Sequence, residues 1–455
     1  MLTFQDLRAV GDDESKRKNF VLSVIQDHER SDDYKVAKDA YEYYCNRNVT
    51  ISEYQKLLYT VSGNAVPDNY SANFKMGSGH FHRFIMQEVQ HLLGNGVSWT
   101  HEDTESKLGT RRYNFDNQLM DAAEKALWGK VSFGFFNKDH VDVFDYLEFA
   151  PLFDEIDGSL KAGVRYWRLD KNKPLRATLY EIDGYTKYVW YARDDEDAHD
   201  EPKRAYLQTI TYSEADGAEI YDEENYPAFP IIPFWANKAH QSEIVGLREQ
   251  IDCFDLIKSG FANVVDEASI MYWTLQNAGG MDDVDLARFV QKMKTVHAAT
   301  MDEDGAKAES HTMDAPFQSR EALLNRLESD LYRDAMAFDV RNIANGAVTA
   351  TQIKANYEDL SKKCDMFEYQ VLKFVDGILE VAGIDDEASF TRTQIVNQTE
   401  HVQTLLQAAQ YLPEDYVTTK VLEIMGDADK VEDVLKKMDE ERYSMLETDE
   451  PTEGE

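Results

Sequence analysis

The sequence predicts a mainly helical α+β fold, and two observations lead to this prediction. Over most of the 455 residues, apolar side chains recur every three or four positions, which is the period of an amphipathic helix. Residues 130–232 instead alternate apolar and polar side chains between Asp-Gly pairs, which is typical of antiparallel strands joined by turns. Because 43% of the residues are hydrophobic and 12% are aromatic, the composition excludes a mainly disordered protein.

The first part of the chain, residues 1–128, is predicted to be helical. Residues 81–93 show this best, because an apolar stripe ends there at Gly94, a common helix stop. The strands of residues 130–232 are expected to turn at Asp157-Gly158 and Asp183-Gly184, and the acidic insert 194–200 is expected to be a solvated loop.

Helical patterning returns after the proline-containing strand 229–235. The spacing predicts a long amphipathic helix with apolar residues from Ile244 to Val265. Residues 268–318 are mixed, with a strand near 270–275 and a short helix opened by Asp282. A second helix is predicted from Ser319 past Phe338, before the turn signal Asn345-Gly346.

The clearest predicted element is a third helix of about 33 residues, or about 50 Å. Thr349 and Gln352 form a capping-box pattern at its start, an apolar stripe runs from Ile353 to Val381, and Gly383 closes it. A helix of this length with one narrow apolar seam must pack along neighbours of similar length. Two shorter helices are expected around Pro413, followed by an acidic tail predicted to be disordered.

Charge and motifs exclude several function classes. The chain has 85 acidic and 48 basic residues, a net charge of −37, which argues against a protein that coats nucleic acid or binds an anionic membrane. The sequence contains no run of eighteen apolar residues and no signal peptide. We therefore expect the protein to be synthesised in the cytoplasm and to stay there. Phosphate-binding loops, nucleophile elbows, zinc-binding HExxH pairs and calcium loops are absent from the sequence. We predict no catalytic residue, no metal and no cofactor.

The cysteines and histidines fit structural roles. The odd number and wide spacing of the cysteines exclude a disulfide framework, and we expect buried thiols at Cys45, Cys253 and Cys364. The one histidine cluster comprises His80, His82 and His91. The first two of these point about 200° apart on a helix and therefore cannot share a metal there.

The order of elements and several segments resemble the portal proteins of tailed bacteriophages, in particular the siphophage type. The most specific segments are PIIPFWANKAHQSEIVGLREQIDCFDLIKSGFANVVDE (230–267) and NGAVTATQIKANYEDLSKKC (345–364). Residues 129–136 and 148–168 and the stretch FTRTQIVNQTEHVQTLLQ (390–407) are also similar. The resemblance covers about residues 70–440.

This resemblance implies a portal fold assembled as a dodecameric ring at one capsid vertex, a DNA channel for viral DNA packaging and DNA ejection. It implies the following division of the chain: N-terminal arm 1–24, wing 25–240 with a helical part and then a strand-rich part, stem helix 241–267, clip 268–318, stem helix 319–341, tunnel loop 342–350, long wing/crown helix 351–383, crown 384–440 and acidic disordered tail 441–455. The protein would be part of the virion, as a head-tail connector, and would be in the host cytoplasm during assembly.

The same resemblance implies partners and site residues. The partners would be the terminase large subunit, head-completion and connector proteins, the major capsid and scaffold proteins, and double-stranded DNA, with no membrane. The loop lining the channel would comprise Asn342, Ile343, Ala344, Asn345, Gly346, Ala347, Val348 and Thr349. Candidate weak DNA contacts are Arg341, Lys354, Lys362 and Lys363. Candidate partner-facing clip residues are Phe289, Met293 and Met313.

Other readings of these residues remain open. An ordinary helix-to-helix turn also explains the uncharged loop, surface solvation also explains the four cations, and core packing also explains the clip residues. A different acidic virion protein, such as a scaffold or connector, would share the acidity and the long helices. A carboxylate-dependent hydrolase is a further alternative, although no motif distinguishes any carboxylate from the others.

Overall fold

The computed structural model describes most of the chain. The described residues are 2–59, 63–69, 71–101, 103–191, 201–212, 219–268, 272–276, 282, 284–285, 287–289, 291, 307–311, 317–342, 350–393, 398–425, 430–431 and 434–438. The acidic insert 194–200, the loop residues Ile343–Thr349, Met293, Met313 and the tail 441–455 therefore lie outside the described residues.

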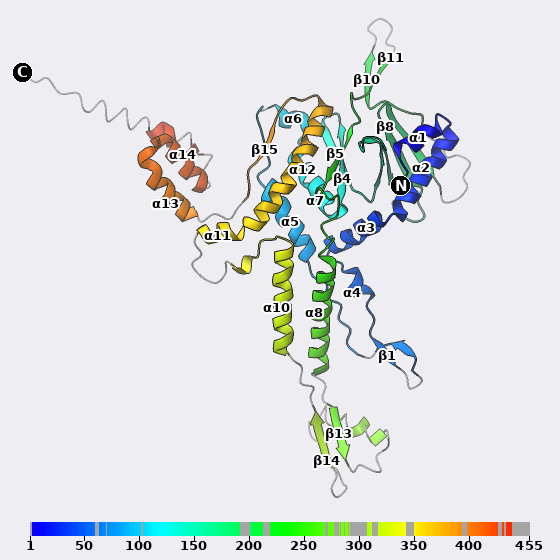
Figure 1. Cartoon of the computed structure of the whole chain (residues 1–455), viewed down its shortest axis with the longest axis vertical. Helices are drawn as coiled ribbons and strands as arrows, with labels where there is room; N and C mark the ends of the chain where they lie inside the picture. The colour runs from blue at the N-terminus through cyan, green and yellow to red at the C-terminus, as the bar shows by residue number, and fades with distance from the viewer. Residues whose placement is uncertain are drawn as a thin grey trace, which may run out of the picture.

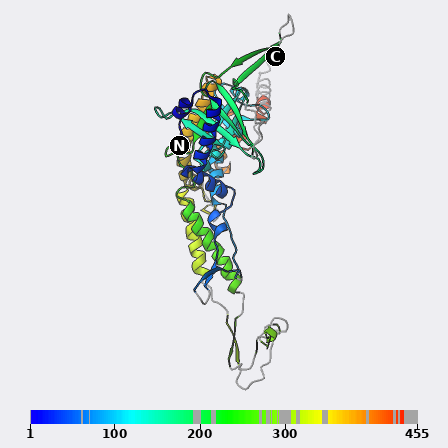
Figure 2. The same cartoon turned by 90° about the vertical axis from the view of Figure 1, so that its right-hand side faces the viewer.

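The molecule is elongated, with a broad body above a two-helix stalk (Figures 1 and 2). The stalk consists of α8 (Arg248–Ala268) and α10 (Phe317–Asp334), which lie side by side. At its far end β13 (Tyr272–Gln276) pairs antiparallel with β14 (Lys307–His311). The side chain of Asp282 accepts backbone hydrogen bonds from Val284 and Asp285, both at 2.9 Å, so the short helical segment that it was predicted to open is confirmed.

The N-terminal part of the chain is largely helical, as predicted. Its helices are α1 (Phe4–Val10), α2 (Glu14–Arg30), α3 (Asp32–Tyr44), α4 (Val49–Glu53), α5 (His80–Leu93), α6 (Thr104–Leu108) and α7 (Phe115–Gly129). Side chains of Asp13, Ser31 and Asn48 accept backbone hydrogen bonds at the starts of α2, α3 and α4, which fixes where these helices begin. The prediction missed the hairpin of β1 (Leu57–Tyr59) and β2 (Ala65–Pro67).

The strand-rich middle contains two antiparallel sheets and a hairpin. The first sheet has the strand order β12-β4-β5 and consists of β4 (Val131–Asn137), β5 (His140–Phe144) and β12 (Ile231–Trp235). The second has the order β6-β7-β8-β9 and consists of β6 (Phe149–Phe153), β7 (Leu160–Trp167), β8 (Leu175–Glu181) and β9 (Gly184–Trp190). The hairpin pairs β10 (Leu207–Tyr212) with β11 (Glu219–Glu224). Both predicted Asp-Gly turns are confirmed, since Gly158 has φ 69° and Gly184 has φ 132°.

The main core lies where α5, α7 and α12 (Glu358–Ala382) cover the β12-β4-β5 sheet. Phe374 of α12 stacks on Phe234 with ring centroids 4.8 Å apart, and Gly134 leaves the space that its ring occupies. A second, smaller core lies between α1, α2 and the β6-β9 sheet. A short pairing of β15 (Ala388–Phe390) with β3 (Val97–Trp99) attaches the chain after α12 to the body.

The three long helices differ from the prediction in their bounds. The first begins at Arg248, not near Ile244, because Gly246 has φ 91°. The second ends at Asp334, not beyond Phe338, because Met336 has φ 52°. The predicted long helix is interrupted at one residue, since α11 (Ala350–Asn356) ends before Tyr357 and α12 starts at Glu358. Tyr357 itself keeps helical angles, φ −86° and ψ −7°, and its amide donates to the Ile353 carbonyl at 3.2 Å.

The C-terminal region contains the two helices that were predicted around Pro413. They are α13 (Gln398–Ala408) and α14 (Glu414–Met425), joined through the 3₁₀ turn η2 (Ala409–Tyr411). A second 3₁₀ turn, η1 (Val340–Asn342), follows the stalk. Among the described residues, no helix is long and apolar enough to cross a membrane.

The cysteine prediction holds for one residue only. Cys364 is buried, but Cys45 is partly exposed and Cys253 is exposed. Cys253 differs because Ile251, Phe254 and Asp255 are the α8 residues around it that face the protein interior.

Candidate functional site

The stalk is fastened at both ends. Where it joins the body, the Gln250 side chain donates a hydrogen bond to Asp334 Oδ2 at 2.8 Å, which connects the first turn of α8 to the last turn of α10. At the other end the rings of Phe261 and Phe317 contact each other with centroids 5.7 Å apart. Arg320 Nη1 also donates to the Gly260 carbonyl at 3.3 Å. These contacts hold α8 and α10 as one unit.

A row of polar side chains on α8 binds residues 71–78, an extended segment that we call the strap. Asn263 Oδ1 accepts from the Phe74 amide at 2.7 Å, and Ser259 Oγ accepts from the Met76 amide at 3.0 Å. Asp255 Oδ2 accepts from the Ser78 amide at 3.1 Å and from Asn48 Nδ2 at 2.8 Å. The spacing of four residues places all three α8 side chains on one helix face, and all three are buried.

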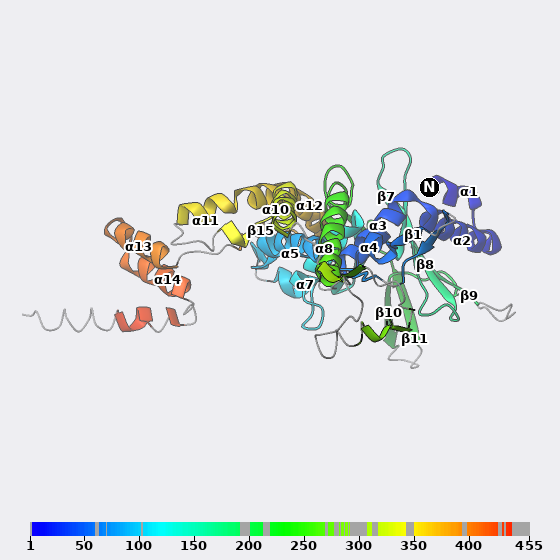
Figure 3. The ribbon, with the colours of Figure 1, turned by 90° about the horizontal axis from the view of Figure 1, so that it is seen from below.

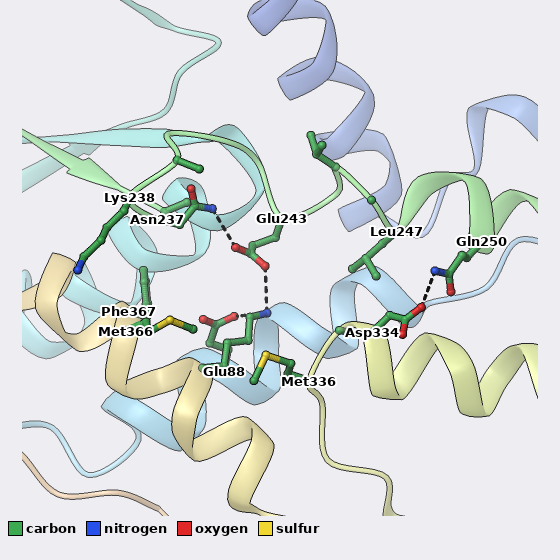
Figure 4. Close-up of a pocket in the computed structure, with 16 residues that line it drawn as sticks. Glu88, Asn237, Lys238, Glu243, Leu247, Gln250, Asp334, Met336, Met366 and Phe367 are labelled. Atoms are coloured by element: carbon green, nitrogen blue, oxygen red, sulfur yellow. Dashed lines mark hydrogen bonds and ion pairs between the residues drawn. The ribbon is translucent and has the colours of Figure 1, made fainter.

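A buried ionic cluster lies where the stalk enters the body. The Nζ atom of Lys363 in α12 lies 2.8 Å from Oε2 of Glu88 in α5. The same Nζ atom lies 3.1 Å from Oε2 of Glu243, which precedes α8. The side chains of Glu88 and Lys363 are 2% and 14% exposed. Asn237 Nδ2 also donates to Glu243 at 3.1 Å, so Glu243 has a second partner, as Figure 4 shows.

The cluster carries one negative charge when both carboxylates are ionised. Burial raises the pKa of Glu88 to about 7, since Lys363 offsets only part of this shift and Glu243 adds to it. Burial by itself lowers the pKa of Lys363, but the two carboxylates outweigh burial and hold its pKa above the usual value. Lys363 therefore stays charged, whereas burial favours the protonated form of Glu88.

The same junction contains a pocket of about 500 Å³ between the end of α10, α12 and residues 236–250. Its wall combines the ionic cluster with apolar side chains, among them Leu247, Met336, Met366 and Phe367 (Figure 4). Stalk, body and α12 meet at this pocket, so a movement of one of them relative to the others changes its shape.

The cations predicted from the sequence are in different environments. Lys354 on α11 is exposed, and Lys362 on α12 is 59% exposed with an ion pair to Glu358 at 2.8 Å. Arg341 is 46% exposed and binds Asp339 at 2.8 Å and Glu328 at 2.5 Å. Lys363 lies inside the chain, in the cluster described above. Of the four candidate DNA contacts, three are exposed in the chain and Lys363 is buried.

The predicted loop and clip residues are described only in part. Asn342 ends the 3₁₀ turn η1, and Ile343–Thr349 lie outside the described residues. Phe289 is 6% exposed, so in this conformation the chain does not present its side chain to a partner.

Sequence reasoning missed Glu88, Glu243 and the polar row of α8. A usable signal existed for the first, because Glu88 falls in the apolar stripe of its helix, four residues from Phe84 and from Leu92. A charge in such a stripe is rarely buried unless it is paired. In the parts of the chain that the structure describes, no three His, Cys, Asp or Glu side chains come together as metal ligands.

Comparison with known proteins gives the family. The family model described as "Phage portal protein, SPP1 Gp6-like" matches residues 24–444. The chain belongs to this portal protein family. A portal protein of Bacillus phage SPP1 is 23% identical over 399 residues, which are 80% of this chain and 75% of that protein. A portal protein of Clostridium phage phiCD119 is 23% identical over 202 residues, which are 42% of this chain and 44% of that protein.

Solved structures with a similar arrangement come from gene transfer agent particles. A chain of the neck of a native particle, computed with C12 symmetry, has a TM-score of 0.41 at 10% identity. A chain of the neck of an empty particle, computed with C6 symmetry, has a TM-score of 0.44 at 11% identity. Each match covers 76% of this portal protein and 90% of the other chain.

Proposed function

We propose that this portal protein forms a ring of twelve copies at one capsid vertex, through which DNA enters during packaging and leaves during ejection. The observation that carries the proposal is the family match over residues 24–444, nearly the whole chain. The two-helix stalk between a broad body and a terminal hairpin supports it, because twelve such stalks side by side would form the wall of a channel (Figure 1).

The domain division proposed above fits these elements. The wing (25–240) corresponds to the body, the stem (241–267 and 319–341) to the stalk, the clip (268–318) to the region of β13 and β14, and the crown (384–440) to the region of α13 and α14. We propose that the clip binds the terminase large subunit during packaging and head-completion proteins afterwards. Capsid and scaffold proteins would contact the ring during assembly in the host cytoplasm.

The charge of the chain suits a channel that guides DNA without binding it tightly. Each phosphate neutralised by a fixed cation adds affinity and slows sliding, whereas acidic walls repel the backbone. Twelve copies at −37 each would sum to −444. The loop 342–349, with no charged residue, would form a steric contact at the narrowest point.

The DNA contacts that we propose are fewer than the four cations predicted. Lys354 and Lys362 are exposed and remain candidates. Arg341 already has two carboxylates, so a phosphate would have to compete with them. Lys363 is held inside the chain, and we propose no DNA contact for it. We also propose no catalytic role, since the energy for packaging would come from a separate motor.

Native mass tests the proposal directly. Twelve chains of 52.3 kDa give roughly 628 kDa, and mass photometry with negative-stain images should show annular particles of this size. Chains that stay monomeric or dimeric across salt concentrations and with added scaffold protein would contradict the ring.

A second experiment tests the loop assignment. Replacing Ala347 and Val348 by tryptophan should leave ring assembly intact and block DNA packaging, because bulk would narrow the channel. Normal DNA packaging by rings of this variant would contradict the assignment of the loop to the narrowest part of the channel.

A further inference from the structure

The β1–β2 hairpin is an apolar projection beside the stalk. Every residue of both strands is exposed, so neither face of the hairpin is covered within the chain. Together with its flanking segments it exposes these large apolar side chains: Tyr54, Leu57, Leu58, Tyr59, Val66, Phe74 and Met76. An isolated two-stranded hairpin is marginally stable in water, and such a cluster of exposed apolar side chains marks an interaction surface.

The base of this hairpin is fixed in position. The strap that follows β2 is bound along α8 by Asp255, Ser259 and Asn263, and these three side chains are 0%, 5% and 4% exposed. On the other side, Thr50 in α4 donates to Asp252 at 2.8 Å. Both ends of the projection are thereby attached to one helix of the stalk.

Two lysines of the projection bind its own main chain. Lys56 Nζ donates to the Ala72 carbonyl at 2.7 Å, and Lys75 Nζ donates to the Ser52 carbonyl. These lysines therefore satisfy carbonyl groups of the projection itself. The large side chains exposed on the projection are mainly apolar, which favours an apolar partner surface over DNA.

The opposite flank of the same stalk is formed by α10. Figures 1 and 3 show the order α10, α8, β1 across the molecule, with the hairpin beside the end of α8 that leads to β13. In the half of α10 nearest β14, Leu323 is 46% exposed, while Phe317, 44% exposed, packs its ring on Phe261 of α8. Val265 near the same end of α8 is 49% exposed.

Two different patches on opposite flanks are what a closed ring requires. A head-to-tail interface joins one patch of each copy to the other patch of the next copy, and the ring closes when the rotation does. In a ring whose axis runs along the stalk, equivalent residues of all copies lie at the same height along that axis. The hairpin of one copy would therefore meet the lower stalk of its neighbour, where Leu323 is exposed.

We propose that the β1–β2 hairpin packs on α10 around Leu323 in the adjacent copy and joins neighbouring stalks. This inference rests on the proposed ring, and it names the contact between its copies. Tyr59, 76% exposed in the single chain, is the central hairpin residue of this contact, and Leu323 is its counterpart on α10.

Substitution of the hairpin tests the contact. Tyr59→Asp and Leu57→Asp should raise the protein concentration at half assembly by about tenfold or more, because a buried charge replaces apolar contact. Leu169→Asp is the matched control, since Leu169 is 88% exposed on the turn after β7 and should assemble as the wild type does. Equal circular dichroism and thermal unfolding of monomers would show that all variants fold.

Cross-linking tests the neighbour directly. In a chain without the native cysteines, copies with Tyr59→Cys are mixed with copies with Leu323→Cys, assembled and oxidised. A disulfide-linked dimer of the two kinds of copy is expected, and neither copy alone should give it.

The outcomes separate this contact from the ring itself. Closed rings without the cross-link, with hairpin variants that assemble like Leu169→Asp, would overturn the hairpin contact and leave the ring. A wild-type chain that never assembles would overturn both. Rings of normal size whose hairpin variants lose only terminase or capsid binding would assign the hairpin to that partner and overturn this proposal.

Discussion

Removal of Lys363 is expected to destabilise the chain strongly, whereas removal of its neighbour Lys362 is not. Lys363→Met leaves Glu88, 2% exposed, without its cation, while Glu243 keeps the hydrogen bond from Asn237. Breaking a buried ion pair in this way costs about 3–5 kcal/mol. Lys362 is 59% exposed and pairs with the exposed Glu358, so Lys362→Met should leave the urea midpoint close to that of the wild type.

Urea unfolding followed by tryptophan fluorescence measures the difference in stability between the two lysine variants. Urea is suitable because it is uncharged and does not screen the ion pairs. All variants should be compared in the same oligomeric state. The loss for Lys363→Met should be smaller at pH 5 than at pH 8, because Glu88, whose pKa burial raises to about 7, is already protonated at pH 5. Equal urea midpoints for the two lysine variants, or a loss for Lys363→Met that does not depend on pH, would refute the account of the cluster.

Three further predictions follow from buried groups. Because burial raises the pKa of Glu88 from 4.5 to about 7, the folded chain binds the extra proton between these values, and the stability from this group falls as pH rises through that range. Glu88→Gln should remove this part of the pH dependence, and parallel pH curves for the variant and the wild type would contradict it. Gly163→Ala should cost about 1–3 kcal/mol in thermal or urea unfolding, because its Cβ would lie 2.1 Å from the ring of the buried Phe149, and an unchanged midpoint would contradict that packing. A thiol reagent should label exposed Cys253 in the folded chain and Cys364 only after unfolding, since burial raises the pKa of Cys364 to about 12; peptide mapping that finds equal labelling would contradict this.

The elements that local pattern determines were predicted from the sequence. The helix from His80 to Leu93 and the strands around Gly158 and Gly184 appear where apolar period and turn residues place them. Local pattern did not reveal the break before α12. Tyr357 lies there between Phe338, with ring centroids 4.1 Å apart, and His91, 5.4 Å apart. The apolar stripe of the sequence continues through Tyr357 and therefore shows no interruption of the helix. The contacts that distinguish Tyr357 are with Phe338 and His91, which are distant in the sequence.

The candidate site was harder to predict than the fold. Lys362 and Lys363 are adjacent and chemically identical, and only the distant Glu88 and Glu243 distinguish the buried one from the exposed one. The β1–β2 hairpin was missed for another reason, since its strands of three residues are too short to show a period of two. Family resemblance predicted the ring and channel, but not the residues that fasten the stalk.

The attachment of the strap to α8 has a consequence for how portal surfaces can diverge. Its hydrogen bonds from residues 74, 76 and 78 all start at main-chain amides, while the side chains of Phe74 and Met76 are 50% and 39% exposed. Every amino acid except proline supplies such an amide. Substitutions at these two positions can therefore change what the surface recognises without moving the segment, because α8 binds the main chain and not these side chains.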